Sequence, residues 1–95
     1  MHLGWADMDL FYVLVNINEF SEEHTLYVEQ PWTLESETRL IEEATAQTLY
    51  YNHQAFERFL EISLIDELLL QYQQHNVCLR EQCQQILEYA LKKRG

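Results

Sequence analysis

Glycine, proline and positive charge are scarce in this sequence. Two glycines, Gly4 and Gly95, and one proline occur among 95 residues, so there is no glycine-rich loop that could hold a phosphate group. Six lysines and arginines face sixteen aspartates and glutamates, which gives a formal net charge of -10 at pH 7. Such a chain attracts cationic surfaces and repels nucleic acid. We therefore expect a basic protein as its partner and no direct contact with nucleic acid.

Long apolar runs are absent as well. No stretch of about 18 apolar residues exists, as a membrane-spanning helix would require. The segment from Met1 to Phe11 holds two aspartates and no basic residue, unlike the start of a secretory signal. The sequence therefore predicts a cytoplasmic protein that does not enter a membrane.

The two cysteines give little indication of an active site. Cys78 and Cys83 are five residues apart on one expected helix, which places their Cα atoms beyond usual disulfide reach. Together with His75 they are the one alternative metal site, but structural zinc sites normally use four ligands in paired short spacings. A cysteine on an amphipathic helix is more often a small core residue than a nucleophile. We predict no metal, no cofactor, no catalytic residues and no enzymatic activity.

Three segments follow the pattern of amphipathic helices. One helix is expected to begin after a cap at Ser63 and to form a hairpin around Asn76 with a C-terminal helix. Another is expected from Asp7 or Asp9 to about Asn18, with Leu10, Val13, Leu14 and Ile17 on one side, although its β-branched residues make a strand the alternative. The C-terminal helix has apolar positions at helical spacing. These positions are Leu79, Gln82, Cys83, Ile86, Leu87, Ala90 and Leu91.

Short β-rich segments occupy the middle of the chain. Thr25 to Glu29 and Thr38 to Glu42 are separated by a proline and polar residues, and Arg58 to Ser63 has the composition of a third strand. Ala44 to Phe56 fits either a helix or an aromatic loop. This order of elements predicts an α+β fold in one domain, residues 1–95. It consists of a small three-stranded antiparallel sheet packed with three to four helices, ending in a C-terminal helical hairpin.

Acidic residues are concentrated in one part of the sequence. Fourteen of the sixteen lie in the first 67 positions, where only Arg39 and Arg58 oppose them. Eight glutamates form the candidate partner-binding surface: Glu19, Glu22, Glu23, Glu29, Glu35, Glu37, Glu42 and Glu43. Four aromatic residues are candidate anchors: Tyr27, Trp32, Tyr50 and Tyr51. The alternative is that the glutamates only keep the surface soluble and that Trp32 covers the core.

Three pieces of the sequence resemble a known family. They are Leu-Tyr-Val at 26–28, Pro-Trp-Thr-Leu at 31–34 and Phe-Leu-Glu-Ile-Ser-Leu-Ile-Asp at 59–66. Together they are similar to small bacterial proteins that include immunity proteins of contact-dependent growth inhibition and polymorphic toxin systems. The likeness extends from Thr25 to Leu91. It implies inhibition by tight binding of a cognate toxin, usually a nuclease, at its active site or another essential surface.

The charge and the resemblance lead to the same hypothesis. A nuclease holds a polyanionic substrate, so its active site is basic, and an array of carboxylates can occupy the same field. We therefore expect an immunity protein that binds and neutralises a basic toxin domain. The alternative is an acidic mimic of nucleic acid, or a regulatory adaptor, that blocks a nucleic-acid-binding protein without a toxin partner.

Overall fold

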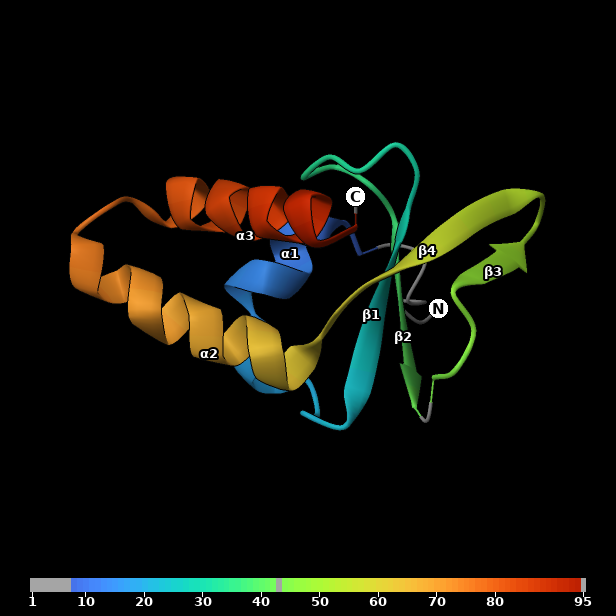
Figure 1. Cartoon of the computed structure of the whole chain (residues 1–95), viewed down its shortest axis with the longest axis horizontal. Coiled ribbons are helices and arrows are strands. Elements are labelled where there is room, and N and C mark those ends of the chain that lie inside the picture. Colours follow the sequence, from blue (N-terminus) through green and yellow to red (C-terminus); the bar gives the residue numbers. More distant parts are fainter. Residues whose placement is uncertain (1–7, 43, 95) are drawn as a thin grey trace, which may run out of the picture.

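A computed structural model of the chain describes residues 8–42 and 44–94, which form an α+β fold (Figure 1). Two short helical segments come first, α1 (Leu10–Val15) and the 3-10 turn η2 (Ile17–Glu19). Four strands follow: β1 (His24–Glu29), β2 (Thr38–Glu42), β3 (Thr48–Tyr51) and β4 (Gln54–Glu61). The chain then forms α2 (Ile62–Tyr72), a second 3-10 turn η3 (Gln73–His75) and α3 (Leu79–Arg94).

The four strands form one antiparallel sheet in the order β2-β1-β4-β3. Within it, Tyr27 of the inner strand β1 pairs with Arg39 on β2 and with Arg58 on β4. The small antiparallel sheet is therefore confirmed, but the described residues form four strands and not the predicted three. The strand predicted at residues 58–63 is the second half of β4, which ends at Glu61.

The missed strand lies within residues 44–56, for which the sequence predicted a helix or a loop. β3 and β4 are joined by a two-residue turn in which Asn52 and His53 both have positive φ, 50° and 68°. Positive φ at both central positions is the geometry of a type I′ hairpin turn, which usually carries glycine at the second position. Asn and His tolerate this region better than most residues, so the hairpin forms without glycine. Of residues 44–56, the loop alternative holds for 44–47 and for the turn at 52–53, whereas both interpretations were wrong for 48–51 and 54–56, because the usual hairpin signal is missing.

The main core lies between one face of the sheet and the helices, which gather on that side (Figure 1). Successive strand residues point to opposite faces, so Leu26 and Val28 of β1 both point toward the helices. The helices contribute these buried residues: Leu10, Val13, Leu14, Ile65, Leu68, Leu69, Cys83, Ile86, Leu87 and Ala90. The apolar faces predicted for the first and last helices are confirmed, except that Leu79 and Leu91 are exposed.

The opposite face of the sheet carries a small aromatic layer. Tyr27 and Phe56 are fully buried, although neither belongs to the main core. Residues 44–47 lie on the path from edge strand β2 to edge strand β3 and cross this face. The Tyr27 hydroxyl donates to the carbonyl oxygen of Ala46, and Arg58 Nη1 donates to that of Ala44 at 3.1 Å. The crossing therefore shields strand residues that face away from the helices.

Local chemistry sets the ends of the helices. Asp9 caps α1, because its Oδ1 accepts a hydrogen bond from the backbone N–H of Tyr12 at 2.8 Å. The alternative start at Asp7 lies outside the described residues. β4 continues directly into α2, which begins at Ile62 without a side-chain cap, so the predicted cap at Ser63 was wrong. Asn76 adopts the left-handed conformation, with φ of 59°, at the predicted turn before α3. None of the described helices combines the length and apolar character of a bilayer span.

Candidate functional site

The sheet divides the predicted glutamates between its two ends. β1 has six residues, which span about 17 Å from the first Cα to the last. Near its start lie Glu19, Glu22, Glu23 and Glu42, the last of which is directly opposite His24. At or beyond its other end lie Glu29, Glu35 and Glu37. Glu43 lies outside the described residues. The glutamates therefore do not form the single surface that their sequence spacing suggested.

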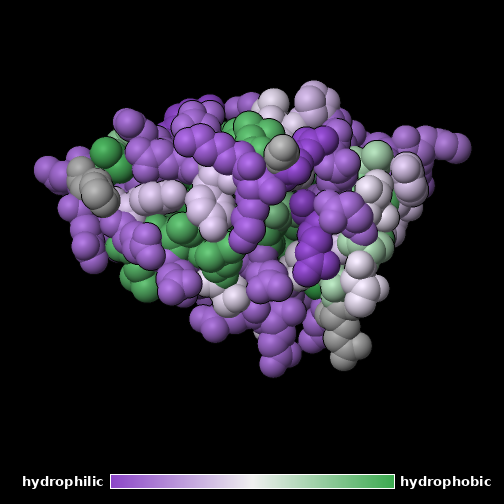
Figure 2. All heavy atoms as spheres, in the orientation of Figure 1, coloured by the Kyte–Doolittle hydropathy of each residue, from purple (hydrophilic) through white to green (hydrophobic). Residues whose placement is uncertain are grey.

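The first group, Glu19, Glu22, Glu23 and Glu42, is called the acidic end below. All four side chains are exposed, and their carboxylates have no ion-pair or hydrogen-bond partner among residues 8–42 and 44–94. Glu61 lies opposite Thr25 at the same end, and its Oε2 is 3.7 Å from Arg58 Nη2. Figure 2 shows hydrophilic side chains at the lower edge of the molecule, beside paler ones. The field of the acidic end is therefore available to an approaching partner.

Glu29 and Glu37 are held inside the structure by one glutamine. Gln54 Nε2 donates to Oε2 of Glu29 at 2.8 Å and to Oε1 of Glu37 at 2.7 Å. Both carboxylates are half-buried, and the backbone N–H of Glu29 donates to the carbonyl oxygen of Glu37 at 2.9 Å. These bonds fasten the β3–β4 hairpin to the start of β2. The two carboxylates therefore have a structural role that the sequence did not indicate.

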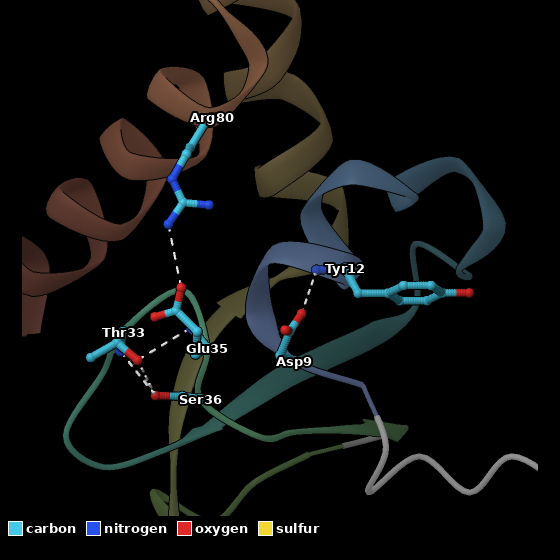
Figure 3. Close-up of polar contacts among 6 residues, drawn as sticks. All are labelled: Asp9, Tyr12, Thr33, Glu35, Ser36 and Arg80. Atoms are coloured by element: carbon cyan, nitrogen blue, oxygen red, sulfur yellow. Dashed lines mark hydrogen bonds and ion pairs between the residues drawn. The ribbon is translucent and has the colours of Figure 1, made fainter.

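Glu35 belongs to a tight turn and has a cationic partner from the helical layer (Figure 3). Arg80 Nη2, in the first turn of α3, is 3.3 Å from Glu35 Oε2. The turn is fixed by two side chains: Ser36 Oγ accepts from the N–H of Thr33 at 2.9 Å, and Thr33 Oγ1 accepts from the N–H of Glu35 at 3.2 Å. The ion pair is exposed and contributes little to stability. It does reduce the charge that Glu35 presents to a partner.

Trp32 covers the core, which was the alternative to its role as an anchor for a partner. The side chain is only 7% exposed, and its Nε1 donates to the carbonyl oxygen of Val28 at 3.1 Å. The ring meets Phe59 edge to face at 4.9 Å between centroids. The guanidinium of Arg94 lies 4.8 Å from the ring and is paired with Glu57 at 3.2 Å. Trp32 therefore offers a partner little contact area.

Tyr50 and Tyr51 point to opposite faces of β3, as neighbouring strand residues do. Tyr50, one of the candidate anchors, is 75% exposed. The ring of Tyr51 meets Phe56 edge to face at 5.9 Å and lies 4.7 Å from the guanidinium of Arg39. Tyr50 pairs with Ala55 near the start of β4, whereas the acidic end adjoins the end of β4. Neither tyrosine therefore joins the acidic end.

A groove of about 470 Å³ lies between β4, α2 and α3. The sequence did not predict it. Arg58, Lys93 and Arg94 line it above an apolar floor that includes Phe59 and Ala90. Arg58 and Arg94 are each paired with a glutamate, so the groove carries little net charge. The sequence held no signal for it, because the cations at the end of α3 are explained by the helix dipole alone.

The cysteines differ in their surroundings. Cys83 is fully buried, and burial raises the pKa of its thiol from 9.0 to about 11, while the nearby Arg80 opposes the shift. A thiol held in its protonated form is a poor nucleophile and a poor metal ligand. Cys78 is exposed and both thiols are free. Within residues 8–42 and 44–94, no three His, Cys, Asp or Glu side chains are grouped so that they could hold a metal ion.

Comparison with known proteins finds no matching family model, no matching curated protein and no matching solved structure.

Proposed function

We propose that this chain is an immunity protein that binds and neutralises a cognate basic toxin domain, a nuclease, through its acidic end. The observation that carries the proposal is the set of four exposed carboxylates without an internal partner among the described residues. Surfaces that serve only solubility intersperse charges of both signs. At the other end of the sheet the chain itself engages its glutamates, through Gln54 and Arg80.

The chemistry of the partner follows from this charge. A cleft that holds a nucleic acid backbone is lined with lysine and arginine, and carboxylates can occupy the positions of the phosphates. Glu42 is a paired residue of the sheet and Glu23 directly precedes one, so the backbone positions of these two residues are fixed before a partner arrives. Long-range attraction of this kind raises association rates by roughly 10-fold to 1000-fold at low salt. The resemblance to immunity proteins of toxin systems supports the same kind of partner.

The first experiment is an affinity capture from the lysate of the source cell at low salt, with mass spectrometry of the eluate. The test variant carries Glu22→Lys, Glu23→Lys and Glu42→Lys. The matched control carries Glu67→Lys, Glu81→Lys and Glu88→Lys, which change three exposed helical glutamates and give the same net charge. We expect the wild type and the control to retain one stoichiometric basic protein, whose nuclease activity the wild type inhibits.

The variant of the acidic end should associate with that protein roughly 10-fold to 1000-fold more slowly, with a weaker dependence on salt. Equal loss of binding in both variants would mean that only the net charge matters and would contradict the proposal. Recovery of several unrelated nucleic-acid-binding proteins, released together at modest salt, would favour a mimic of nucleic acid instead.

A further inference from the structure

A small hollow with both apolar and polar residues in its lining lies where three helices of the chain meet. It has a volume of about 140 Å³ and is called the helical hollow below. Its apolar lining comes from α1, η2, α2 and the start of α3: Leu14, Val15, Ile17, Leu69, Leu70 and Leu79. Val15 is 38% exposed, Leu70 57% and Leu79 45%. Three large aliphatic side chains from three helices therefore converge on one opening in the surface.

This convergence distinguishes the hollow from ordinary surface leucines. Single exposed aliphatic residues are normal and need no explanation, whereas grouped ones around a depression are typical of protein interfaces. Leu79 illustrates the point, because helical spacing places it on the apolar face of α3 and yet no described residue covers it fully. By contrast, Leu91 at the other end of α3 is similarly exposed and does not line the hollow.

The residues that line the helical hollow carry a negative charge and no positive one. Asp66 is the one charged residue among those that line it, and no lysine or arginine does. Asn18 also lines it, and the next residue, Glu19, belongs to the acidic end. α2 contacts η2, so the hollow and the acidic end are joined through this turn. A partner that covers the acidic end therefore lies beside the turn that leads to the hollow.

We propose that the helical hollow takes an apolar side chain, such as leucine, from a lysine-rich or arginine-rich segment of the same partner. The inference rests on the proposed function for the partner's charge, but it concerns different residues and a different kind of contact. A second copy of this chain is an unfavourable occupant, because each copy carries a net charge of -10. The carboxylates bring the partner near, and the hollow slows its release.

The test uses two synthetic peptides and the whole protein. One peptide contains only leucine and lysine in the pattern of an amphipathic helix, and the other has serine in place of each leucine. We expect the leucine peptide to bind roughly 10-fold to 100-fold more tightly, as burial of one leucine side chain allows. In NMR spectra of the protein, binding of the leucine peptide should shift the backbone amide signals of Val15, Leu70 and Leu79.

Two variants test whether the helical hollow causes the tighter binding of the leucine peptide. Leu70→Ser combined with Leu79→Ser should remove it, whereas the matched control Leu91→Ser should leave it unchanged. Both retain the main core, since all three leucines are exposed, and far-ultraviolet circular dichroism checks their folding.

Each contrary result has a separate meaning. Equal binding of the two peptides would overturn the hollow while leaving the acidic end as the binding surface. Loss of the preference for the leucine peptide in Leu91→Ser would show that the peptide does not bind specifically at the helical hollow. Self-association of the free protein that Leu70→Ser abolishes would identify a second copy as the occupant and overturn the choice of partner. A leucine preference that survives reversal of Glu22, Glu23 and Glu42 without any change in affinity would support the hollow and contradict the proposed function.

Discussion

Replacing Phe56 by alanine tests whether residues 44–47 close the second face of the sheet. Phe56 is fully buried, yet it lies outside the main core, on the face of the sheet that residues 44–47 cross. Its ring meets Tyr51 at 5.9 Å between centroids and lies 5.2 Å from the guanidinium of Arg39. Loss of a buried phenylalanine side chain destabilises a protein by about 3–5 kcal/mol. We therefore expect Phe56→Ala to lower the free energy of unfolding by about 4 kcal/mol.

Two further substitutions separate burial from the specific contacts of the ring. Phe56→Leu keeps most of the apolar volume and should lower the free energy of unfolding by about 1–2 kcal/mol, part of it from the lost contacts with Tyr51 and Arg39. Tyr50→Ala is the matched control on the same hairpin. Its side chain is 75% exposed, so the change should stay within about 0.5 kcal/mol.

The assay is equilibrium unfolding in urea, followed by circular dichroism. A domain of this size has a free energy of unfolding of roughly 5–14 kcal/mol, so Phe56→Ala should remain measurable or unfold outright. A cost below about 1 kcal/mol for Phe56→Ala, close to that of Tyr50→Ala, would refute the reasoning. It would mean that water reaches this face and that residues 44–47 do not shield it.

Two other predictions concern the acidic end and the buried thiol. Glu22→Gln, Glu23→Gln and Glu42→Gln together should raise Tm at about 10 mM salt, because neighbouring like charges repel, and the gain should shrink at about 150 mM salt. A fall in Tm, or a gain that ignores salt, would contradict the description of these carboxylates as unpaired. The thiol of Cys83 should lower stability at high pH: its pKa is about 11 in the folded chain and 9.0 in the unfolded one, so the unfolded chain loses its proton first. Urea unfolding between pH 8 and 11 should therefore show a decline above pH 9 that Cys83→Ala lessens, and an unchanged slope would show that this thiol is not the cause.

The sequence predicted correctly those elements that show one clear local pattern, either helical spacing of apolar residues or a β-rich segment between turn residues. The helical spacing of Leu10, Val13 and Leu14 predicted the buried face of α1, and β-rich segments bounded by turn residues predicted β1 and β2. β3 was not predicted, because its sequence shows no alternation between apolar and polar residues. Its turn escaped because His53 stands where glycine usually appears. The shielding of Tyr27 and Phe56 could not be predicted, since it depends on a connection that crosses between the two edges of the sheet.

The candidate site was only partly visible in the sequence, and the reason is the path of the chain. Glu23 and Glu29 are near in sequence, but a strand separates them by most of the length of the sheet. Glu23 and Glu42 are far apart in sequence, but antiparallel pairing brings them to the same end. Contacts such as that of Gln54 with Glu29 and Glu37 depend on the hairpin that the sequence did not reveal.

The carboxylates of the acidic end project from the places where chain segments start and stop. Glu22 and Glu23 belong to a turn, Glu42 is the last residue of its strand, and Glu19 ends a short 3-10 turn. None of the four contributes to the main core or to the aromatic layer behind the sheet. Substitutions at such positions change what a protein recognises without disturbing how it folds. On the proposed function, a few codon changes at these four positions would alter the partner that the protein binds, while both interior layers keep their residues.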